Sequence, residues 1–469
     1  MLNQILTNIN NFMYTYPLLI LLVGAGIYFT IRTKFVQVRM IGEAVRIVTE
    51  KDPGRKTGKQ VSSFQALMIS TASRVGTGNI AGIATAIAAG GPGAVFWMWV
   101  MAVIGGASAF IESTLAQIYK VRDGEAFRGG PSYYMERALG RRWLGVVFSV
   151  LLILCFAYGF NGLQSFNISS SLEYYIPGYS KSLYPAVAGI VVAGATAFVI
   201  FGGAHRIGFI SSVIVPVMAA GYLLLGFATI LLHLSELPEI FRQILSNAFE
   251  FRAISGGFAG SAVVIGIKRG LFSNEAGMGS APNASAAASV SHPAKQGLVQ
   301  VLSVFIDTLL ICSATAMMLL VSGVNGIPEK LDGIPFVQAA VSSNVGSWGI
   351  HFITFSIFAF AFSSLIGNYF YAESNFLFIS QGDRRFLNLF RLTCLLAVFL
   401  GAQADFSVVW NIADITMGLM AIVNIISILS LGGIAVKVLR DYEKQKSLGK
   451  DPVFQAGKLG ISNTDCWND

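Results

Sequence analysis

Charged residues are scarce in this chain, because Asp, Glu, Lys and Arg together make up only 12% of its 469 residues. A soluble domain carries about twice that share, roughly 25%. Hydrophobic residues make up 54% of the chain, and the mean hydropathy is +0.65. Such a sequence has too few polar side chains to cover a soluble protein of this length, so we predict a membrane protein.

Cysteine and histidine are also scarce, with four residues each. No CxxC pair and no histidine spacing indicates a metal site, and the cysteines show no pattern typical of a disulfide framework. The sequences typical of serine hydrolases, zinc peptidases and nucleotide-binding proteins are absent as well. We therefore expect neither an enzyme nor a protein with a resident cofactor.

Long uncharged apolar runs recur along the whole chain, and many approach the ~20 residues that a helix needs to cross the hydrocarbon core. They predict an all-α polytopic membrane protein with about eleven transmembrane helices. The expected spans are residues 14–31, 63–89, 92–118, 143–166, 183–202, 208–234, 257–288, 296–321, 345–379, 386–402 and 405–436.

The basic residues predict how these spans are oriented. Most of the 32 lysines and arginines fall in segments on one side of the membrane, whereas the other side carries only Lys181, Arg242, Arg252 and Lys330. Cytoplasmic loops are enriched in basic residues. We therefore expect a multi-pass protein of the cytoplasmic (inner) membrane, with its N-terminus outside and its C-terminus inside. The net charge of +8 follows from this topology and gives no reason to propose nucleic acid as a partner.

Two of the apolar segments carry the same polar interruption. Residues 73–82 read SRVGTGNIAG and residues 268–277 read KRGLFSNEAG, so that Arg74, Asn79 and Gly82 align with an identical residue in the second segment. Charged and polar residues in the middle of a span are costly and are typical of functional sites. Matched interrupted spans in two halves of a chain are typical of the binding site of a secondary transporter.

The interrupted spans are the second and the seventh, so they cross the membrane in opposite directions. This spacing predicts two inverted five-helix repeats at residues 63–234 and 235–436. Residues 1–62 then form an additional N-terminal helix with a basic loop, and residues 437–469 form a cytoplasmic tail. The loop and the tail are both short, which argues against a receptor or scaffold with a large soluble domain.

A broken helix inside a membrane leaves backbone groups that something else must satisfy. Amides at the start of a half-helix suit a carboxylate, and carbonyls at the end of the other half suit Na⁺ or an ammonium group. A zwitterionic amino acid meets both needs, and Gly76 and Gly78 permit the irregular backbone. The alternative is that these glycines only let helices pack closely.

Four motifs resemble the alanine or glycine:cation symporter family, also called the sodium:alanine symporters. They are TASRVGTGNIAG at residues 71–82, GGPGAVFWMW at 90–99, GGPSYYM at 129–135 and FSNEAGMGSAP at 272–282. The resemblance extends over nearly the whole chain. It implies a LeuT-type fold and the symport of a small neutral amino acid with Na⁺ as the coupling ion.

The resemblance also implies site residues. The backbone amides of Thr77 and Gly78 would hold the substrate carboxylate. The full set of expected substrate-binding residues is Thr77, Gly78, Asn79, Gln164, Phe166, Phe272, Ser273, Asn274, Gly277 and Asn368. The expected sodium ligands are oxygens of Ala72, Val75, Phe360, Ser363 and Ser364, an all-oxygen set of the kind that a hard cation needs. The alternative for the two serines is that they bond to their own helix.

Two of these positions bear on the substrate. Phe272 is either an aromatic gate over the substrate or an ordinary core residue. Asn368 stands in GNYFYAE (residues 367–373), where family members often have Trp in a sequence like Gly-Trp-x-Tyr-Tyr-Gly-Glu. Asn frees volume and adds an amide, so we hypothesise that the substrate is larger and more polar than alanine, such as glutamine, or that the pocket is broader.

Charged residues within the spans need partners. Arg74, Lys268 and Arg269 are the cations, and the candidate partners are Glu112, Glu275, Asp307, Glu373 and Asp414. We expect ion pairs that brace the bundle more than direct contacts with the substrate. A fixed cation near the broken helices could also replace Na⁺. Import of alanine, glycine or possibly glutamine with Na⁺ is therefore our prediction, and a proton-coupled or uncoupled amino acid permease is the alternative.

Overall fold

The structure is a computed structural model, and it describes residues 2–50, 60–250, 261–323 and 333–467. Within these residues, seven helices are long and apolar enough to cross a membrane. They span Gln4–Arg32, Gly93–Ile118, Arg142–Ser170, His205–Leu232, Pro293–Leu320, Trp348–Ile379 and Phe406–Ser447. Two shorter apolar helices, Tyr184–Ile200 and Leu387–Gly401, accompany them. The expectation of a helical polytopic membrane protein is confirmed.

The helices follow one another as short and long segments. The first half contains α1 (Leu2–Met13), η1 (Tyr14–Leu18), α2 (Leu19–Arg32), α3 (Val36–Arg39), α4 (Ile41–Thr49), α5 (Ser63–Arg74), η2 (Thr77–Asn79), α6 (Ala81–Gly90), α7 (Gly93–Ile118), α8 (Pro131–Arg137), α9 (Arg142–Leu152), η3 (Ile153–Phe160), α10 (Asn161–Ser170), η4 (Tyr179–Lys181), α11 (Tyr184–Ile200) and α12 (Gly203–Leu232). The second half contains α13 (Leu237–Ala248), α14 (Ala262–Asn274), α15 (Pro282–Ala287), α16 (Pro293–Phe305), η6 (Ile306–Cys312), α17 (Ser313–Leu320), α18 (Gly333–Val345), α19 (Trp348–Ile379), α20 (Leu387–Gly401), α21 (Phe406–Ser447) and η7 (Gly457–Leu459).

Several limits differ in detail from the expected spans. Helix α21 continues to Ser447, so the boundary expected at residues 436 and 437 falls inside it. The expected span 257–288 begins at residues that lie outside the described ones. A two-stranded antiparallel hairpin, β1 (Val121–Asp123) and β2 (Ala126–Arg128), adds a small β element to the otherwise helical chain.

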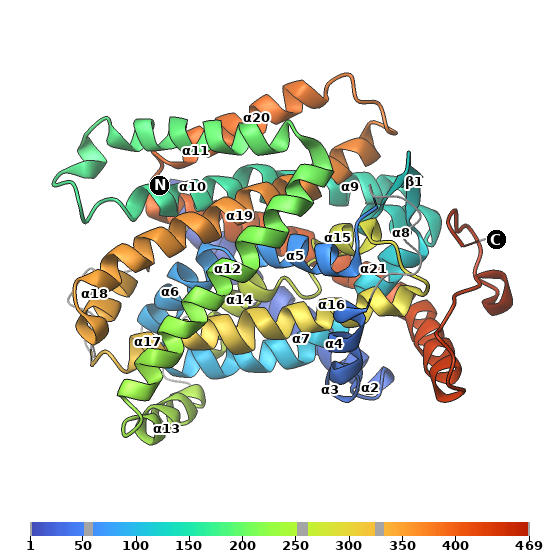
Figure 1. Cartoon of the computed structure of the whole chain (residues 1–469), viewed down its shortest axis with the longest axis horizontal. Coiled ribbons are helices and arrows are strands. Elements are labelled where there is room, and N and C mark those ends of the chain that lie inside the picture. Colours follow the sequence, from blue (N-terminus) through green and yellow to red (C-terminus); the bar gives the residue numbers. More distant parts are fainter. Residues whose placement is uncertain (1, 51–59, 251–260, 324–332, 468–469) are drawn as a thin grey trace.

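Most of the long helices run side by side across the view of Figure 1. Helices α7 and α16 pack along each other, and α7 also packs against α14 and α15. Helices α11 and α20 form a second pair beside α10 and α19 (Figure 1). The hairpin, α8 and the end of the chain lie at one end of the bundle, while α13 and α18 lie at the other (Figure 1).

The first predicted interruption is a true break in a helix. Ser62 begins α5 with a capping box, because its hydroxyl accepts from the Gln65 amide and Gln65 Oε1 accepts from the Ser62 amide. The helix ends at Arg74, the short turn η2 follows, and α6 resumes at Ala81. All residues from Ser70 to Ala84 are buried, so the irregular backbone lies inside the protein.

The second interruption lies later in the chain than the motif indicates. Helix α14 remains regular through Gly270 and ends at Asn274, and the irregular backbone follows it. Glu275, Gly277 and Gly279 have positive φ angles of 54°, 82° and 89°, and α15 begins at Pro282. The motif glycine Gly270 instead packs against α7, since a Cβ there would lie 3.0 Å from the Cβ of Met101. At that position close packing explains the glycine.

Candidate functional site

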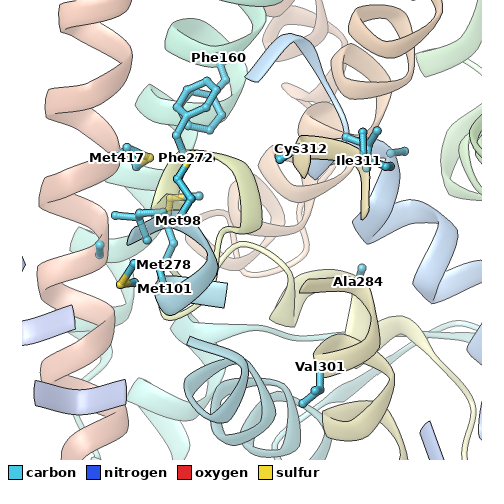
Figure 2. Packing of buried hydrophobic residues seen from close by; sticks show 14 of the residues in the cluster. Met98, Met101, Phe160, Phe272, Met278, Ala284, Val301, Ile311, Cys312 and Met417 are labelled. Atoms are coloured by element: carbon cyan, nitrogen blue, oxygen red, sulfur yellow. The ribbon is translucent and has the colours of Figure 1, made fainter. Parts of the chain in front are cut away.

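The two helix breaks meet in the middle of the bundle. Helix α14 contacts both η2 and α6. The aromatic ring of Phe272, near the end of α14, lies directly against Gly78 and leaves no room there for a side chain. Figure 2 shows Phe272 beside Phe160, with Met98, Met101, Met278 and Met417 around the same region. Position 78 must therefore be a glycine, because the ring of Phe272 fills the space that a side chain would need.

Side chains satisfy the polar backbone of the first break. The Thr77 amide donates to Gln164 Oε1 at 3.1 Å, and the Gly76 amide donates to Asn79 Oδ1 at 3.3 Å. Asn167 Nδ2 donates to the Thr77 hydroxyl at 3.0 Å. All these groups are buried. The amides of Gly76 and Thr77 donate to neutral side-chain oxygens instead of helix carbonyls. A stronger acceptor can therefore take the place of these side chains.

A buried carboxylate of η6, Asp307, links the first break to the end of α14. Asn79 Nδ2 donates to Asp307 Oδ1 at 2.6 Å, and the Ser273 hydroxyl donates to Asp307 Oδ2. Asn274 Oδ1 accepts from the Ala276 amide at 3.0 Å, whereas its buried Nδ2 has no hydrogen-bond partner among the described residues. Asn79 and Ser273 are thus joined through Asp307 where the first break meets the end of α14, and Asn274 is the last residue of α14. Their role in binding substrate stays a prediction.

Aromatic rings cover this region. The ring of Phe272 lies 4.9 Å from that of Phe160 and 5.3 Å from that of Trp410, measured between centroids. The guanidinium of Arg269 stands 4.6 Å above the Trp410 ring, a cation–π arrangement. Phe272 therefore belongs to an aromatic cluster at the break, a position compatible with either a gate or a core residue.

The predicted cation ligands converge in part. The Ser364 hydroxyl lies 2.9 Å from the Ala72 carbonyl oxygen of α5 and 3.0 Å from the Phe360 carbonyl oxygen of α19. The Ser363 hydroxyl donates to Phe360 at 2.9 Å and otherwise lies near Met218 Sδ, at 3.8 Å. Val75 is buried at the end of α5. The Ser364 hydroxyl therefore contacts both Ala72 and Phe360, whereas the Ser363 hydroxyl contacts its own helix and Met218 of α12.

Two expected substrate residues, Phe166 and Gly277, have their contacts elsewhere. Phe166 is half-buried and packs against Phe406, with centroids 5.9 Å apart. The amide of Gly277 donates to Glu112 Oε1 at 3.2 Å, and its carbonyl accepts from Asn424 Nδ2 at 2.9 Å.

Asn368 lies one turn beyond Ser364, as predicted from its place in α19. Its Oδ1 accepts from the Ser73 hydroxyl at 2.7 Å, and its Nδ2 donates to Asn161 Oδ1 at 3.0 Å. It therefore ties α5 and α10 to α19 beside the cation ligands, and in the structure it is fully buried.

The motifs did not indicate Asn167, Phe160 and Trp410, which touch the site residues directly. Asn167 follows Gln164 by three residues, so helical spacing alone places both side chains on one face of α10. Phe160 and Trp410 looked like any other aromatic residue of an apolar span. The sequence predicts Asp307 only as a possible ion-pair partner, and the structure places it in η6, in contact with Asn79 and Ser273.

The embedded cations have different partners. Lys268 Nζ lies 2.6 Å and Arg269 Nη2 2.7 Å from Asp414 Oδ2, and Asn10 Nδ2 lies 3.3 Å from the same oxygen. These ion pairs confirm the expected bracing role for two cations. Glu373 pairs with Arg391 at 3.5 Å. Among the described residues, no guanidinium nitrogen of Arg74 has a hydrogen-bond partner, although the side chain is buried.

Comparison with known proteins identifies the family. The model of the sodium:alanine symporter family matches residues 1–456. The chain belongs to the sodium:alanine symporter family. This symporter is 48% identical over 468 residues to the amino-acid carrier protein AlsT of Bacillus subtilis, covering 100% of this chain and 98% of AlsT. It is 46% identical over 471 residues to the probable sodium/glutamine symporter GlnT of the same organism, covering 99% and 97%.

The fold of the symporter is also found among solved structures. A manganese transporter of Eremococcus coleocola matches it with a TM-score of 0.51 at 13% identity, over 88% of this chain and 92% of that chain. At such low identity the match shows a shared fold alone. The family that the motifs resemble is thus confirmed: the protein is a sodium-coupled amino acid symporter of the membrane and not an enzyme.

Proposed function

We propose that this symporter imports small neutral amino acids, such as alanine, glycine or glutamine, together with Na⁺. The observation that carries the proposal is the meeting of two helix breaks inside the bundle, with Gly78 against Phe272 and Asn79 beside Ser273 and Asp307. An amino acid carries one negative and one positive group. The amides at the start of a half-helix suit the carboxylate, and the carbonyls at the end of a half-helix suit the ammonium group.

The amides of Thr77 and Gly78 hold the substrate carboxylate in this proposal. The Thr77 amide now donates to Gln164, a neutral acceptor. A carboxylate is a stronger acceptor, since hydrogen bonds to an ionised group are about twice as strong as neutral ones. Substrate therefore displaces the side chain of Gln164 from the Thr77 amide, and Gln164, Asn167 and Phe272 become walls of the pocket.

Na⁺ binds in this proposal between α5 and α19, through the carbonyl oxygens of Ala72, Val75 and Phe360 and the hydroxyls of Ser363 and Ser364. The contact of Ser364 with Ala72 supports it, because this hydroxyl already bridges the two helices. Ser363 requires a change of rotamer to join the set, since its hydroxyl donates to its own helix. A cation that joins α5 to α19 favours the conformation in which these helices touch.

We also propose eleven spans, with inverted repeats at residues 63–234 and 235–436, a helix that precedes them and a tail inside the cell. Two broken helices, one at the beginning of each repeat, support this arrangement, and so does the fold shared with the manganese transporter. Transport then works by alternating access: Na⁺ and substrate bind from outside, and movement of one part of the bundle against the other releases them inside.

The choice of substrate depends on the volume beside Asn368. Asn368 is shorter than the Trp that family members often carry, and its amide is engaged by Ser73 and Asn161. GlnT, with 46% identity, is by its name a probable glutamine symporter. We propose that glutamine competes with alanine in this protein. Indifference of alanine uptake to an excess of glutamine would contradict the proposal.

The experiment is uptake of labelled alanine into proteoliposomes under an inward Na⁺ gradient and, in parallel, an inward proton gradient. Glycine and glutamine serve as competitors. Accumulation with Na⁺ alone is the expected result. Accumulation with protons alone would instead support the alternative of a proton-coupled permease, and equilibration without accumulation under either gradient would support an uncoupled one.

A further inference from the structure

The tail residues 451–467 lie against the beginning of α5 and the segment that follows α15. Trp467 packs against a small apolar cluster that includes Ala66 of α5 and Ala288 after α15. Its Nε1 donates to the Gln117 carbonyl at the end of α7, at 2.8 Å. One indole ring therefore lies where three separate parts of the bundle meet.

A buried lysine lies beside this ring. Lys120 is only 2% exposed, and its Nζ lies 4.8 Å from the centre of the Trp467 ring and 4.1 Å from that of Phe127 in the hairpin. Nζ also donates to the Ala288 carbonyl at 2.9 Å. Within the described part of the chain no carboxylate pairs with this ammonium group, so two rings and one carbonyl take the place of water around it. Lys120 thus depends on Trp467 for one side of its surroundings.

The two helices that meet at this ring are the ones next to the breaks. Helix α5 ends at the first break, and α15 begins after the second. They pack against each other, and at the ends away from the breaks the Ser289 amide donates to the Val61 carbonyl at 2.9 Å. A helix that ends at irregular backbone can pivot there, because a few residues absorb the change in backbone angles. Trp467 therefore joins the outer ends of two helices that are free to move at their inner ends.

We propose that residues 451–467 form a latch of the transport cycle, with Trp467 and Lys120 as its positioning residues. This inference rests on the proposed function. While Trp467 is in place, α5 and α15 are held together and the site is closed on this side, which is predicted to be cytoplasmic. The ring withdraws when the site opens there to release Na⁺ and the amino acid, and it returns when the site closes again.

Other contacts keep the tail attached while the ring moves. Asp465 pairs with Arg137 of α8 at 2.5 Å, and Asn463 Nδ2 donates to the carbonyl of the same arginine at 3.1 Å. Asp451 pairs with Lys295 of α16 at 2.9 Å. These three contacts go to α8 and α16 instead of α5 and α15. Withdrawal of Trp467 therefore does not require the whole tail to leave the bundle.

The neighbouring Cys466 reports on the position of the ring in the wild-type protein. Its Sγ lies 3.5 Å from the Lys120 carbonyl and it is half-buried, whereas the other three cysteines are buried. The test measures how fast a maleimide labels this thiol in the full-length protein in detergent, and Cys466→Ser gives the background. We expect alanine added with Na⁺ to speed labelling severalfold over Na⁺ alone, because substrate lets the protein reach the state that is open on this side. Equal rates under the two conditions would overturn the latch.

Substitution of Trp467 tests the latch by transport. In Trp467→Ala the apparent affinity for Na⁺ should weaken by roughly two- to tenfold, because the state that is closed on this side loses the contacts of the ring and is less populated. Trp467→Phe keeps a ring beside Lys120 and should restore most of the affinity. Asp465→Asn changes the same tail away from the ring and should behave as the wild type. A lower melting temperature of Trp467→Ala with an unchanged Na⁺ dependence would make the ring merely structural and overturn the latch.

The outcomes separate this inference from the function on which it rests. Exchange of labelled for unlabelled alanine in proteoliposomes needs no ion gradient, so its absence in the wild type would overturn the proposed function. Exchange of alanine together with labelling of Cys466 that ignores alanine would keep the function and overturn the latch. Labelling of the wild type decides the matter even if a variant does not fold.

Discussion

Ser364 joins two helices by a single hydroxyl group, which reaches the Ala72 carbonyl of α5 and the Phe360 carbonyl of its own helix. Ser363, its neighbour in sequence, reaches α12 through Met218 and makes no recorded contact with α5. Adjacent serines of α19 therefore point to different helices. This difference allows a matched test of the proposed Na⁺ site within one turn of one helix.

Ser364→Ala should weaken the apparent affinity for Na⁺ by roughly tenfold or more, because losing one ligand of a buried cation costs about 1.5–3 kcal/mol. Ser363→Ala should weaken it less, since that hydroxyl must first leave its own helix. The measurement is the Na⁺ dependence of alanine uptake. Equal and small effects of both substitutions would speak against a cation between α5 and α19.

Asp414 is the common partner of Lys268 and Arg269 and is almost fully buried. Asp414→Asn leaves the buried Arg269 and the half-buried Lys268 without a counter-charge, which should cost about 3–5 kcal/mol of stability. Thermal unfolding in detergent measures the loss. Glu239→Gln is the control, because its ion pair with Arg242 is exposed to solvent and should contribute nothing measurable. A melting temperature of Asp414→Asn equal to that of the control would show that the cations find other partners.

At the scale of elements, the second break depends on backbone that few residues can adopt. Gly277 and Gly279 both have positive φ angles, and Glu275 shares this conformation. At Gly279 a Cβ would also lie 2.8 Å from Asn424 Cγ and 2.9 Å from Pro131 Cγ. Two features therefore restrict the connection between α14 and α15 to glycine at position 279. One is the positive φ angle, and the other is the close approach of α8 and α21.

Gly279→Ala should destabilise the protein by about 2 kcal/mol or more, since a left-handed conformation alone costs an alanine about 1–2 kcal/mol. Gly24→Ala is the control: it lies inside α2 with no atom within 4 Å of the added carbon. There alanine should be neutral or stabilising, because it is the better helix former. Melting temperatures of the two variants give the comparison. Equal values would mean that the break tolerates a side chain.

The sequence alone predicts the helices and the first break, but it does not predict the role of Gly270. The thickness of the hydrocarbon core fixes the length of each span, so apolar runs show where helices lie. The first break follows from SRVGTG, because Gly76 and Gly78 lie in it. Gly270 stands in a similar motif and yet is helical, because what decides its role is the approach of Met101 from α7. The contacts of Trp410 and Asp307 likewise depend on how distant helices pack, which local patterns do not contain.

At the scale of the whole molecule, the end of the chain returns to the helix bundle. The backbone amide of Phe454 donates to the Ser291 carbonyl at 3.0 Å, and Asp451 pairs with Lys295 at 2.9 Å. Near the terminus, Trp467 Nε1 donates to the Gln117 carbonyl at 2.8 Å. These contacts fasten the tail to the ends of α7 and α16, at the end of the bundle where α8 and the hairpin lie (Figure 1).

The tail also reaches the base of the first broken helix. Trp467 packs with Val61 and Ala66, at the start of α5, and with Ala288 after α15. Val61 itself is bridged to this connection, because the Ser289 amide donates to the Val61 carbonyl at 2.9 Å. The beginning of α5 and the end of α15 are therefore held together both directly and through one indole ring.

Trp467→Ala should lower the stability of the folded protein by about 1.5 kcal/mol, the lower end of the value for burying a large apolar side chain, because the indole ring is half-buried. The loss also removes the hydrogen bond to Gln117 and the ring that lies 4.8 Å from Lys120 Nζ. Asp465→Asn is the matched control in the same tail, because its ion pair with Arg137 is half-exposed and contributes little. Thermal unfolding of the full chain measures both. If Trp467→Ala unfolds at the temperature of the control, the tail rests on the bundle without stabilising it; a clear difference makes the indole ring a structural part of the transporter.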